Sequence, residues 1–308
     1  MSLEQWIAII ISTITAATPL IYAALGALVC ERAGVLNLGV EGMMLVGAIA
    51  AFAVAVSSGS LLLAYAAAIA ASAAMGLLFA VLTLSLQTNQ VATGLALALF
   101  GTGLSAFLGQ EFVGIPVQRV PVLAVPWLSQ LPVLGPLLFR HDALVYLSLV
   151  LYFGVAYFLY RSHAGLRLRA IGESPPVAHA LGEPVIRIRY LAVVFGGAMS
   201  GVAGAYLSTA LTPMWVEGMT AGRGWIVLAL VVFATWKPGR VLLGAYLFGG
   251  MTVLQLYAQG LGVRVPSEFM SMLPYLATIV VLVLICRDPK TILLNQPASL
   301  GRSFHPDG

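Results

Sequence analysis

The feature that most constrains this chain is the length of its uncharged stretches. From Gly42 to Gln110 the sequence contains no Asp, Glu, Lys, Arg or His, whereas about a quarter of the residues in a soluble domain are charged. One helical crossing of a bilayer needs about 20 mostly apolar residues, so this stretch is long enough for several. Over the whole chain, 60% of the residues are hydrophobic and 8% are charged. These proportions exclude a water-soluble globular enzyme, a disordered chain and a nucleic-acid-binding protein.

The other uncharged stretches complete a series of predicted spans. Only helices and closed barrels satisfy the backbone in lipid, and these stretches lack the alternation of barrel strands. Polar breaks at Ser57–Ser60 and Gln87–Gln90 divide the longest stretch. We therefore expect an all-α integral membrane protein with about eight spans, one or two of them partial. The predicted spans are Gln5–Cys30, Glu41–Val56, Leu61–Leu86, Val91–Leu108, Ala143–Tyr160, Tyr190–Val216, Val241–Val263 and Phe269–Cys286.

Two further apolar regions are not predicted to be ordinary spans. Val120–Phe139 contains four prolines, each of which would remove a helical hydrogen bond. We therefore expect Gly109–Asp142 to form a structured loop outside the cell. Gly224–Trp236 is too short to cross upright alone, although a lead-in from Met219 would lengthen it.

The basic residues predict the orientation. The loop Arg161–Arg189, the turn Trp236–Arg240 and the tail at 287–308 all carry an excess of basic residues, and such segments stay in the cytoplasm. This places the N-terminus outside and the C-terminus inside the cell. The first apolar stretch lacks a basic leader and a clear cleavage site, so we interpret it as a retained span and not as a signal peptide.

Two distant segments resemble each other. Asn37–Gly47 and Met219–Ala229 are both glycine-rich leads into a short apolar helix, and each follows a span. The predicted topology gives them opposite directions through the membrane. Transporters built from inverted repeats place broken helices at such corresponding positions, near the substrate path. We therefore expect an inverted-repeat fold with the pathway close to these two segments.

Polar and aromatic residues near the starts of the spans are candidates for the translocation pathway. If a helix begins at Asn37, then Asn37 and Glu41 share one of its faces. Two interpretations of Glu41 stay open: it lines a pathway, or it stabilises the N-terminus of its helix. Trp215 can stack against a base, although we favour the membrane interface, where tryptophan gathers by default. The full candidate set is Asn37, Glu41, Asn89, Gln90, Trp215 and Arg223.

The basic loop contains a predicted short helix. Ser174 can serve as the N-cap and Pro175 as the first helical residue, and Gly182 can end the helix in the left-handed conformation. Val177, Ala180 and Leu181 then share one face. Such a helix either inserts into a groove on another protein or lies on its own bundle, and the sequence leaves both open.

Several of these segments resemble one known family. Gly34–Gly47, Gln90–Gly109, Leu166–Gly182 and Gly218–Phe233 are similar to permease subunits of ABC importers, in the branch that holds ribose, branched-chain amino acid and nucleoside permeases. The Asn-Leu-Gly-Val-Glu-Gly-Met-Met and Ala-Gly-Arg-Gly-Trp-Ile runs look most like the nucleoside type. The resemblance is weakest in Gly109–Asp142 and after Pro289.

This resemblance implies partners. Two permeases would form one pathway, in this branch often as a heterodimer, in the plasma (inner) membrane. The loop around Arg169–Gly182 would be the coupling helix that docks on a cytoplasmic ATPase, and an extracytoplasmic binding protein would deliver the solute. The chain has no Walker A motif, so we expect the partner to use ATP and this chain to bind no cofactor or metal and to catalyse nothing.

The expected cargo is a nucleoside, with a simple sugar or another small polar metabolite as the alternative. A secondary transporter with Glu41 as its ion-coupling residue is the main rival to the ABC interpretation. A passive channel subunit is a further alternative. An intramembrane enzyme is disfavoured, because His141, His163, His179 and His305 all lie in predicted loops or the tail.

Overall fold

The computed structural model describes residues 3–260, except for 125, 127, 128 and 130–132. It also describes isolated positions between 266 and 283, and residues 295–305. Within these residues, seven helices are long and apolar enough to cross a membrane. This confirms the predicted all-α membrane architecture, and by length and composition the seven helices coincide with seven of the predicted spans. Much of the eighth, Phe269–Cys286, lies outside the described residues. The seven are α1 (Leu3–Arg32), α2 (Val40–Ser58), α3 (Leu61–Ala80) with the π-helical turn η1 (Val81–Ser85), α4 (Gln90–Gly109) with the 3-10 turn η2 (Gln110–Phe112), α6 (Ala143–Arg161), α9 (Val185–Tyr206) with the π-helical turn η4 (Leu207–Leu211), and α11 (Pro238–Gly260).

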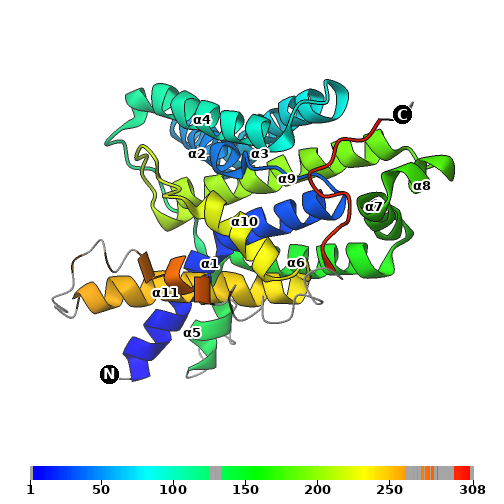
Figure 1. Ribbon diagram of the computed structural model, residues 1–308. Coiled ribbons are helices and arrows are strands. Elements are labelled where there is room, and N and C mark those ends of the chain that lie inside the picture. The colour runs from blue at the N-terminus through cyan, green and yellow to red at the C-terminus, as the bar shows by residue number, and fades with distance from the viewer. Residues whose placement is uncertain are drawn as a thin grey trace.

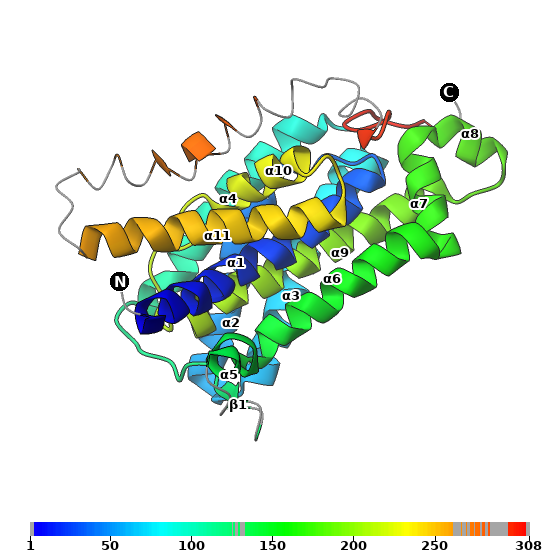
Figure 2. The ribbon, with the colours of Figure 1, turned by 90° about the horizontal axis from the view of Figure 1, so that it is seen from below.

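Helix α9 lies at the centre of the bundle. It packs against α1, α2 and α3, with α2, α3 and α4 on one side of it and α1, α6 and α11 on the other (Figure 1). Seen from below, α11, α1 and α6 run side by side (Figure 2).

Glycines on α9 explain its central position. A β-carbon built on Gly26 of α1 would lie 3.2 Å from the Cα of Gly196. One built on Gly47 of α2 would lie 2.6 Å from the Cα of Gly201. Small residues allow membrane helices to approach closely, where dispersion contacts and not the hydrophobic effect hold them together. The glycine-rich sequence of α9 therefore accommodates neighbours on several of its faces.

The described residues of the region Gly109–Asp142 include a small sheet and a short helix; its location outside the cell stays a prediction. Strand β1 (Val122–Ala124) pairs antiparallel with β2 (Arg140–Asp142), and the short helix α5 (Leu134–Phe139) leads into β2. Asp142 then caps α6, because its Oδ1 accepts bonds from the backbone N–H groups of Leu144 and Val145, both at 3.0 Å.

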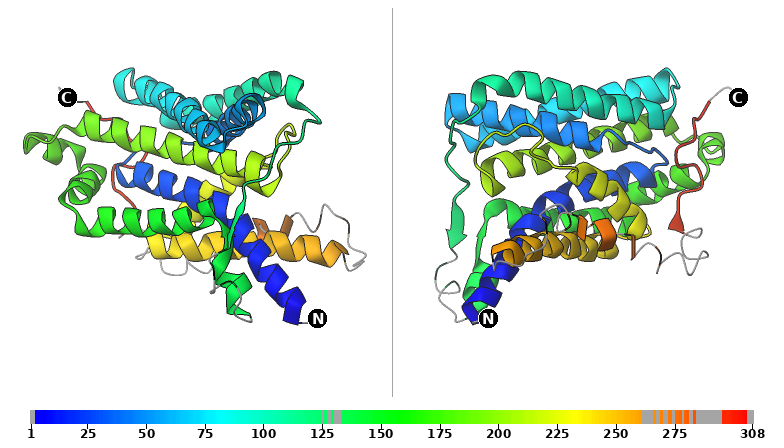
Figure 3. Two further views of the ribbon diagram at one scale, coloured as in Figure 1. Left: turned by 180° about the vertical axis from the view of Figure 1, so that it is seen from behind. Right: turned by 60° about the vertical axis from the view of Figure 1, so that its left-hand side comes forward.

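The basic loop contains two helices where the sequence predicted one. They are α7 (His163–Glu173) and α8 (Pro175–Ala180), and they project together from one end of the bundle (Figures 1 and 3). Ser162 caps α7 by accepting a bond from Gly165 N at 3.0 Å.

The remaining helix, α10 (Arg223–Phe233), is only 11 residues long, about 16 Å at 1.5 Å per residue, so it cannot cross the bilayer.

Candidate functional site

The connection between α1 and α2 re-enters the bundle without helical structure. Leu36 N donates to Gln90 Oε1 at the start of α4 (2.8 Å). Further along, a β-carbon on Gly101 of α4 would lie 2.5 Å from the Cα of Gly42. Gly101 lies about 16 Å along α4 from Gln90, which is near the middle of a helix that is about 30 Å long. Helix α2 therefore begins at mid-depth in the bundle.

A second non-helical segment, residues 212–222, descends from the opposite end. Trp215 packs in a buried cluster with Phe52 in the second half of α2. Seven residues later, Gly222 N donates to the side chain of Glu41 at the start of α2 (2.9 Å). Phe52 and Glu41 are about 16 Å apart along α2. Helix α10 therefore also begins at mid-depth, and the two segments that resemble each other in sequence meet there.

Glu41 joins the two helix starts. Its Oε1 accepts bonds from Thr220 Oγ1 (2.5 Å) and Gly222 N, and its Oε2 accepts from Gly224 N (2.5 Å). The side chain is buried, at 8% exposure. A carboxylate at a helix N-terminus satisfies unpaired N–H groups and interacts favourably with the helix dipole. The hydrogen bonds of Glu41 therefore stabilise the start of α10, while the residue itself lies in the first turn of α2.

Glycine at position 224 is required for this contact. A β-carbon there would lie 2.5 Å from the Cα of Glu41, closer than real β-carbons approach. Gly222, the residue before α10, has a φ of +79°, in the region that glycine adopts without strain. The glycines of the Ala-Gly-Arg-Gly-Trp run therefore give the α10 backbone close access to the carboxylate.

The other predicted pathway residues mostly bond to the backbone. Asn37 does not begin a helix, which corrects that premise: its Oδ1 accepts a bond from Gly39 N (2.8 Å) inside the non-helical connection. Asn89 is exposed and caps α4 through Ala92 N (3.0 Å). Arg223 donates to the carbonyls of the turn before α10. That any of them lines a pathway stays a prediction.

Trp215 is packed inside the protein. It is 2% exposed, so its ring does not face lipid; its position at the level of the membrane interface stays a prediction. Trp225, by contrast, is 40% exposed.

The predicted docking helix has the expected free face. Val177 is 59% exposed and Leu181 79%, and Ala180 is exposed beside them. On the opposite side, Ala178 is buried with Ile171 and Val185. Helix α8 therefore lies on its own bundle with one face and presents an apolar face to the outside; its insertion into a groove on another protein stays a prediction.

The ends of α8 match the prediction only in part. Pro175 is its first residue, and Gly182 follows it with a φ of +85°, as expected for a glycine that ends a helix. Ser174 occupies the N-cap position, but its hydroxyl makes no capping bond. Ser174 is therefore the N-cap residue, as predicted, but it does not supply the side-chain hydrogen bond expected of it.

Sequence reasoning missed how the C-terminal residues attach beside α8. Arg189 of α9 is 1% exposed, and it donates to Ala33 O and Ser299 Oγ, both at 3.0 Å. Ser299 Oγ in turn donates to Gly172 O of α7 (2.7 Å). The described residues 295–305, red in Figures 1 and 3, thus cross the end of the bundle next to α7 and α8. The signal was an arginine adjoining an apolar stretch, which requires a partner, although the sequence does not name that partner.

A second buried network joins α1 to the turn before α11. Arg32 NH2 donates to Trp236 O (2.8 Å), and Trp236 Nε1 donates to Glu31 Oε2 (2.6 Å). Charged side chains this deep remain stable only when they are paired or hydrogen-bonded. The basic end of the bundle is therefore fixed by polar bonds among α1, α9, α11 and the C-terminal residues.

Comparisons with known proteins agree with this architecture. Residues 9–284 match the sequence profile of the family described as branched-chain amino acid transport system / permease component. The chain is 44% identical to the putative glucose ABC transporter permease protein of Haloferax volcanii, over 96% of both chains. It is 33% identical to the nucleoside ABC transporter permease protein of Lactococcus lactis, over 87% of this chain and 88% of that protein.

A third relative is the guanosine ABC transporter permease protein of Bacillus subtilis, which is 30% identical over 92% of this chain and 93% of its own length. No solved structure matches the chain significantly. The profile match and these relatives confirm the resemblance found in the sequence: the chain belongs to the branched-chain amino acid transport system permease family of ABC importers.

Proposed function

We propose that this ABC permease of a sugar- or nucleoside-type import system carries nucleosides, as one of two permease subunits that together enclose the pathway. Two relatives support this cargo, since they are described as nucleoside and guanosine permeases and cover most of the chain. The 44% identical relative, described as a putative glucose permease, supports a hexose as the second candidate. Both cargoes are neutral and rich in hydroxyl groups.

The observation that carries the proposed mechanism is the exposed apolar face of α8. Val177, Ala180 and Leu181 are exposed together on a short helix that the bundle supports from behind. An apolar helix face suits a groove on a second protein. We infer that this protein is the cytoplasmic ATPase, which places α8 and the C-terminus inside the cell and the N-terminus outside. An extracytoplasmic binding protein would deliver the cargo.

The bonding of Glu41 favours ATP over an ion gradient as the energy source. An ion-coupling carboxylate must take up and release its ion in every cycle. Glu41 instead accepts three hydrogen bonds from donors at the start of α10, and each such bond to a charged group is worth about 1.5–3 kcal/mol. Releasing them in every cycle would disrupt the start of that helix.

The test is uptake by vesicles that contain the chain, its ATPase and a second permease, supplied with the binding protein outside. We expect uptake of labelled guanosine that requires ATP at the ATPase face and persists when ionophores dissipate the ion gradients. Unlabelled nucleosides should compete and glucose should not. Competition by glucose alone would overturn the nucleoside assignment, and uptake driven by a gradient without ATP would overturn the ABC mechanism.

A further inference from the structure

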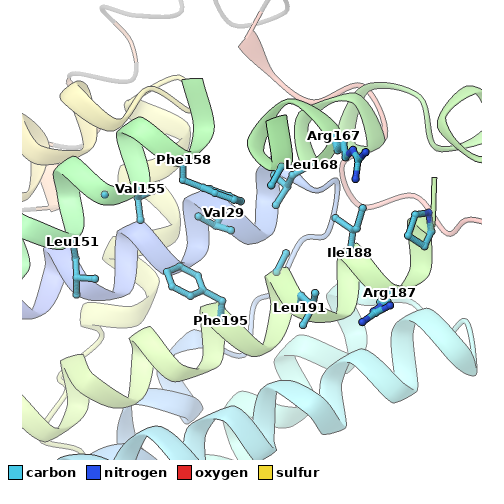
Figure 4. Close-up of a pocket in the computed structure, with 14 residues that line it drawn as sticks. Val29, Leu151, Val155, Phe158, Arg167, Leu168, Arg187, Ile188, Leu191 and Phe195 are labelled. Atoms are coloured by element: carbon cyan, nitrogen blue, oxygen red, sulfur yellow. The ribbon is translucent and has the colours of Figure 1, made fainter. Parts of the chain in front are cut away.

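An apolar groove lies on the bundle away from the Glu41 junction. It is a cavity of about 610 Å³ between α6 and α9, with α1 at its floor and α7 at one end. Val155 and Phe158 of α6 face Leu191 and Phe195 of α9 across it (Figure 4). Except near the α7 end, the lining is almost wholly aliphatic and aromatic.

The groove has the length of one bilayer leaflet. Along α9 its lining extends from Arg187 to Phe195, about 12 Å at 1.5 Å per residue. Along α6 it continues to Leu151, about 15 Å from Arg161 at the end of that helix. Half of a bilayer's hydrocarbon core is about 15 Å thick. The groove therefore begins where α7 meets the bundle and ends near the bilayer midplane.

Two arginines lie at the α7 end of the groove, Arg167 on α7 and Arg187 on α9 (Figure 4). Arg167 forms an ion pair through its Nε with Glu183 Oε1 (3.1 Å), and its side chain is 61% exposed. Among the described residues, neither the side chain of Arg187 nor the terminal nitrogens of Arg167 form a hydrogen bond. Guanidinium groups suit phosphate oxygens, and basic pockets between membrane helices bind anionic headgroups.

We propose that this groove binds one anionic phospholipid, with an acyl chain between α6 and α9 and the phosphate between Arg167 and Arg187. The combination of a leaflet-deep apolar groove with two cations at its mouth matches the two parts of such a lipid. Gly154 leaves room for the chain, since no atom of the described residues would lie within 4 Å of a β-carbon there. The site depends on neither the cargo nor the ATPase.

The experiment uses the full-length protein, purified in mild detergent and titrated with phosphatidylglycerol under native mass spectrometry. The wild type should retain one lipid per chain. We expect Arg167→Gln/Arg187→Gln to bind about 30-fold more weakly, because each basic residue near a headgroup contributes roughly a fivefold factor. The matched control is Arg161→Gln/Lys237→Gln, which removes two exposed cations that do not line the groove and should bind normally.

A second pair of variants tests the acyl-chain part independently. Gly154→Leu should fill the groove and displace the lipid, whereas Gly103→Leu on α4, which also enters open space, should not. Equal retention by all four variants would overturn the proposal. Displacement of the lipid by inorganic phosphate would also overturn the proposal, because it would indicate a free-phosphate site. Separation of permease subunits by Gly154→Leu without loss of lipid would overturn it too, because the groove would then be a protein interface.

Discussion

Thr220→Val removes one of the three donors that hold the Glu41 carboxylate. Thr220 Oγ1 and Glu41 Oε1 are 2.5 Å apart, and both side chains are buried. Valine has nearly the same shape, so the substitution mainly removes the hydroxyl. A hydrogen bond to a charged group contributes about 1.5–3 kcal/mol. We therefore expect the free energy of unfolding to fall by about 2 kcal/mol.

Glu41→Gln perturbs the same junction from the other side. An amide that keeps its oxygen toward Thr220 turns its NH2 group toward Gly224 N, so the bond recorded there is lost. The remaining bonds become neutral and weaken by about 1 kcal/mol each. Because a neutral side chain also costs less to bury, we expect a net loss of about 3 kcal/mol.

Combining the two variants tests the bond itself. In the Glu41→Gln background the Thr220 bond is neutral, so Thr220→Val should cost only about 1 kcal/mol there, a coupling of about 1 kcal/mol. The assay is equilibrium unfolding in mixed micelles with increasing SDS. The control is Thr102→Val, which removes a hydroxyl that donates to Ala98 O of its own helix. We expect this substitution to lower the free energy of unfolding by less than about 0.5 kcal/mol.

Equal costs of Thr220→Val in the two backgrounds would refute this account of the junction. The account would also be refuted by a Glu41→Gln variant that unfolds like the wild type but cannot transport. In that case Glu41 would be a pathway or coupling residue and not a structural one.

Three further substitutions test separate contacts. Gly101→Leu should prevent correct folding, since its β-carbon would meet the backbone of Gly42. The control Gly103→Leu should give a normal yield of monodisperse protein on gel filtration. Similar gel-filtration profiles of the two variants would contradict the close approach of α2 and α4. Leu181→Asp should leave insertion unchanged but abolish cargo-stimulated ATP hydrolysis, and normal hydrolysis would eliminate α8 as the docking helix. Ser299→Ala removes the oxygen that links Arg189 to α7, so limited proteolysis should cleave the C-terminal residues faster than in wild type; an unchanged rate would mean that this link does not hold them.

The spans were predictable because charged residues and short polar breaks mark their ends. The charge-free stretches, with the longest divided at Ser57–Ser60 and Gln87–Gln90, predicted the seven described spans to within a few residues at most ends. The exception is α9 with η4, which extends from Val185 to Leu211 and not from Tyr190 to Val216 as predicted. It begins earlier because Arg189 is hydrogen-bonded and buried instead of solvated. A sequence shows that a charge exists but not that a distant serine satisfies it.

The junction was predictable only in part. The similarity of Asn37–Gly47 and Met219–Ala229 indicated two corresponding broken segments, and these segments do meet. Their contact could not be predicted, because it joins residues about 180 positions apart through one carboxylate, and no local propensity encodes such a pair. The inverted symmetry of the two segments stays a prediction.

The most direct test of the central claim, that a separate ATPase moves this permease through α8, is cross-linking from Leu181→Cys in the assembled complex. The variant also carries Cys286→Ser, so that this native thiol does not react with the reagent. Cys30 is left in place because it is buried. The account predicts that a short bifunctional thiol reagent joins position 181 to the ATPase, and that Val122→Cys, exposed on β1 near the opposite end of α6, gives no such product. A cross-link from position 122 and none from position 181 would contradict it.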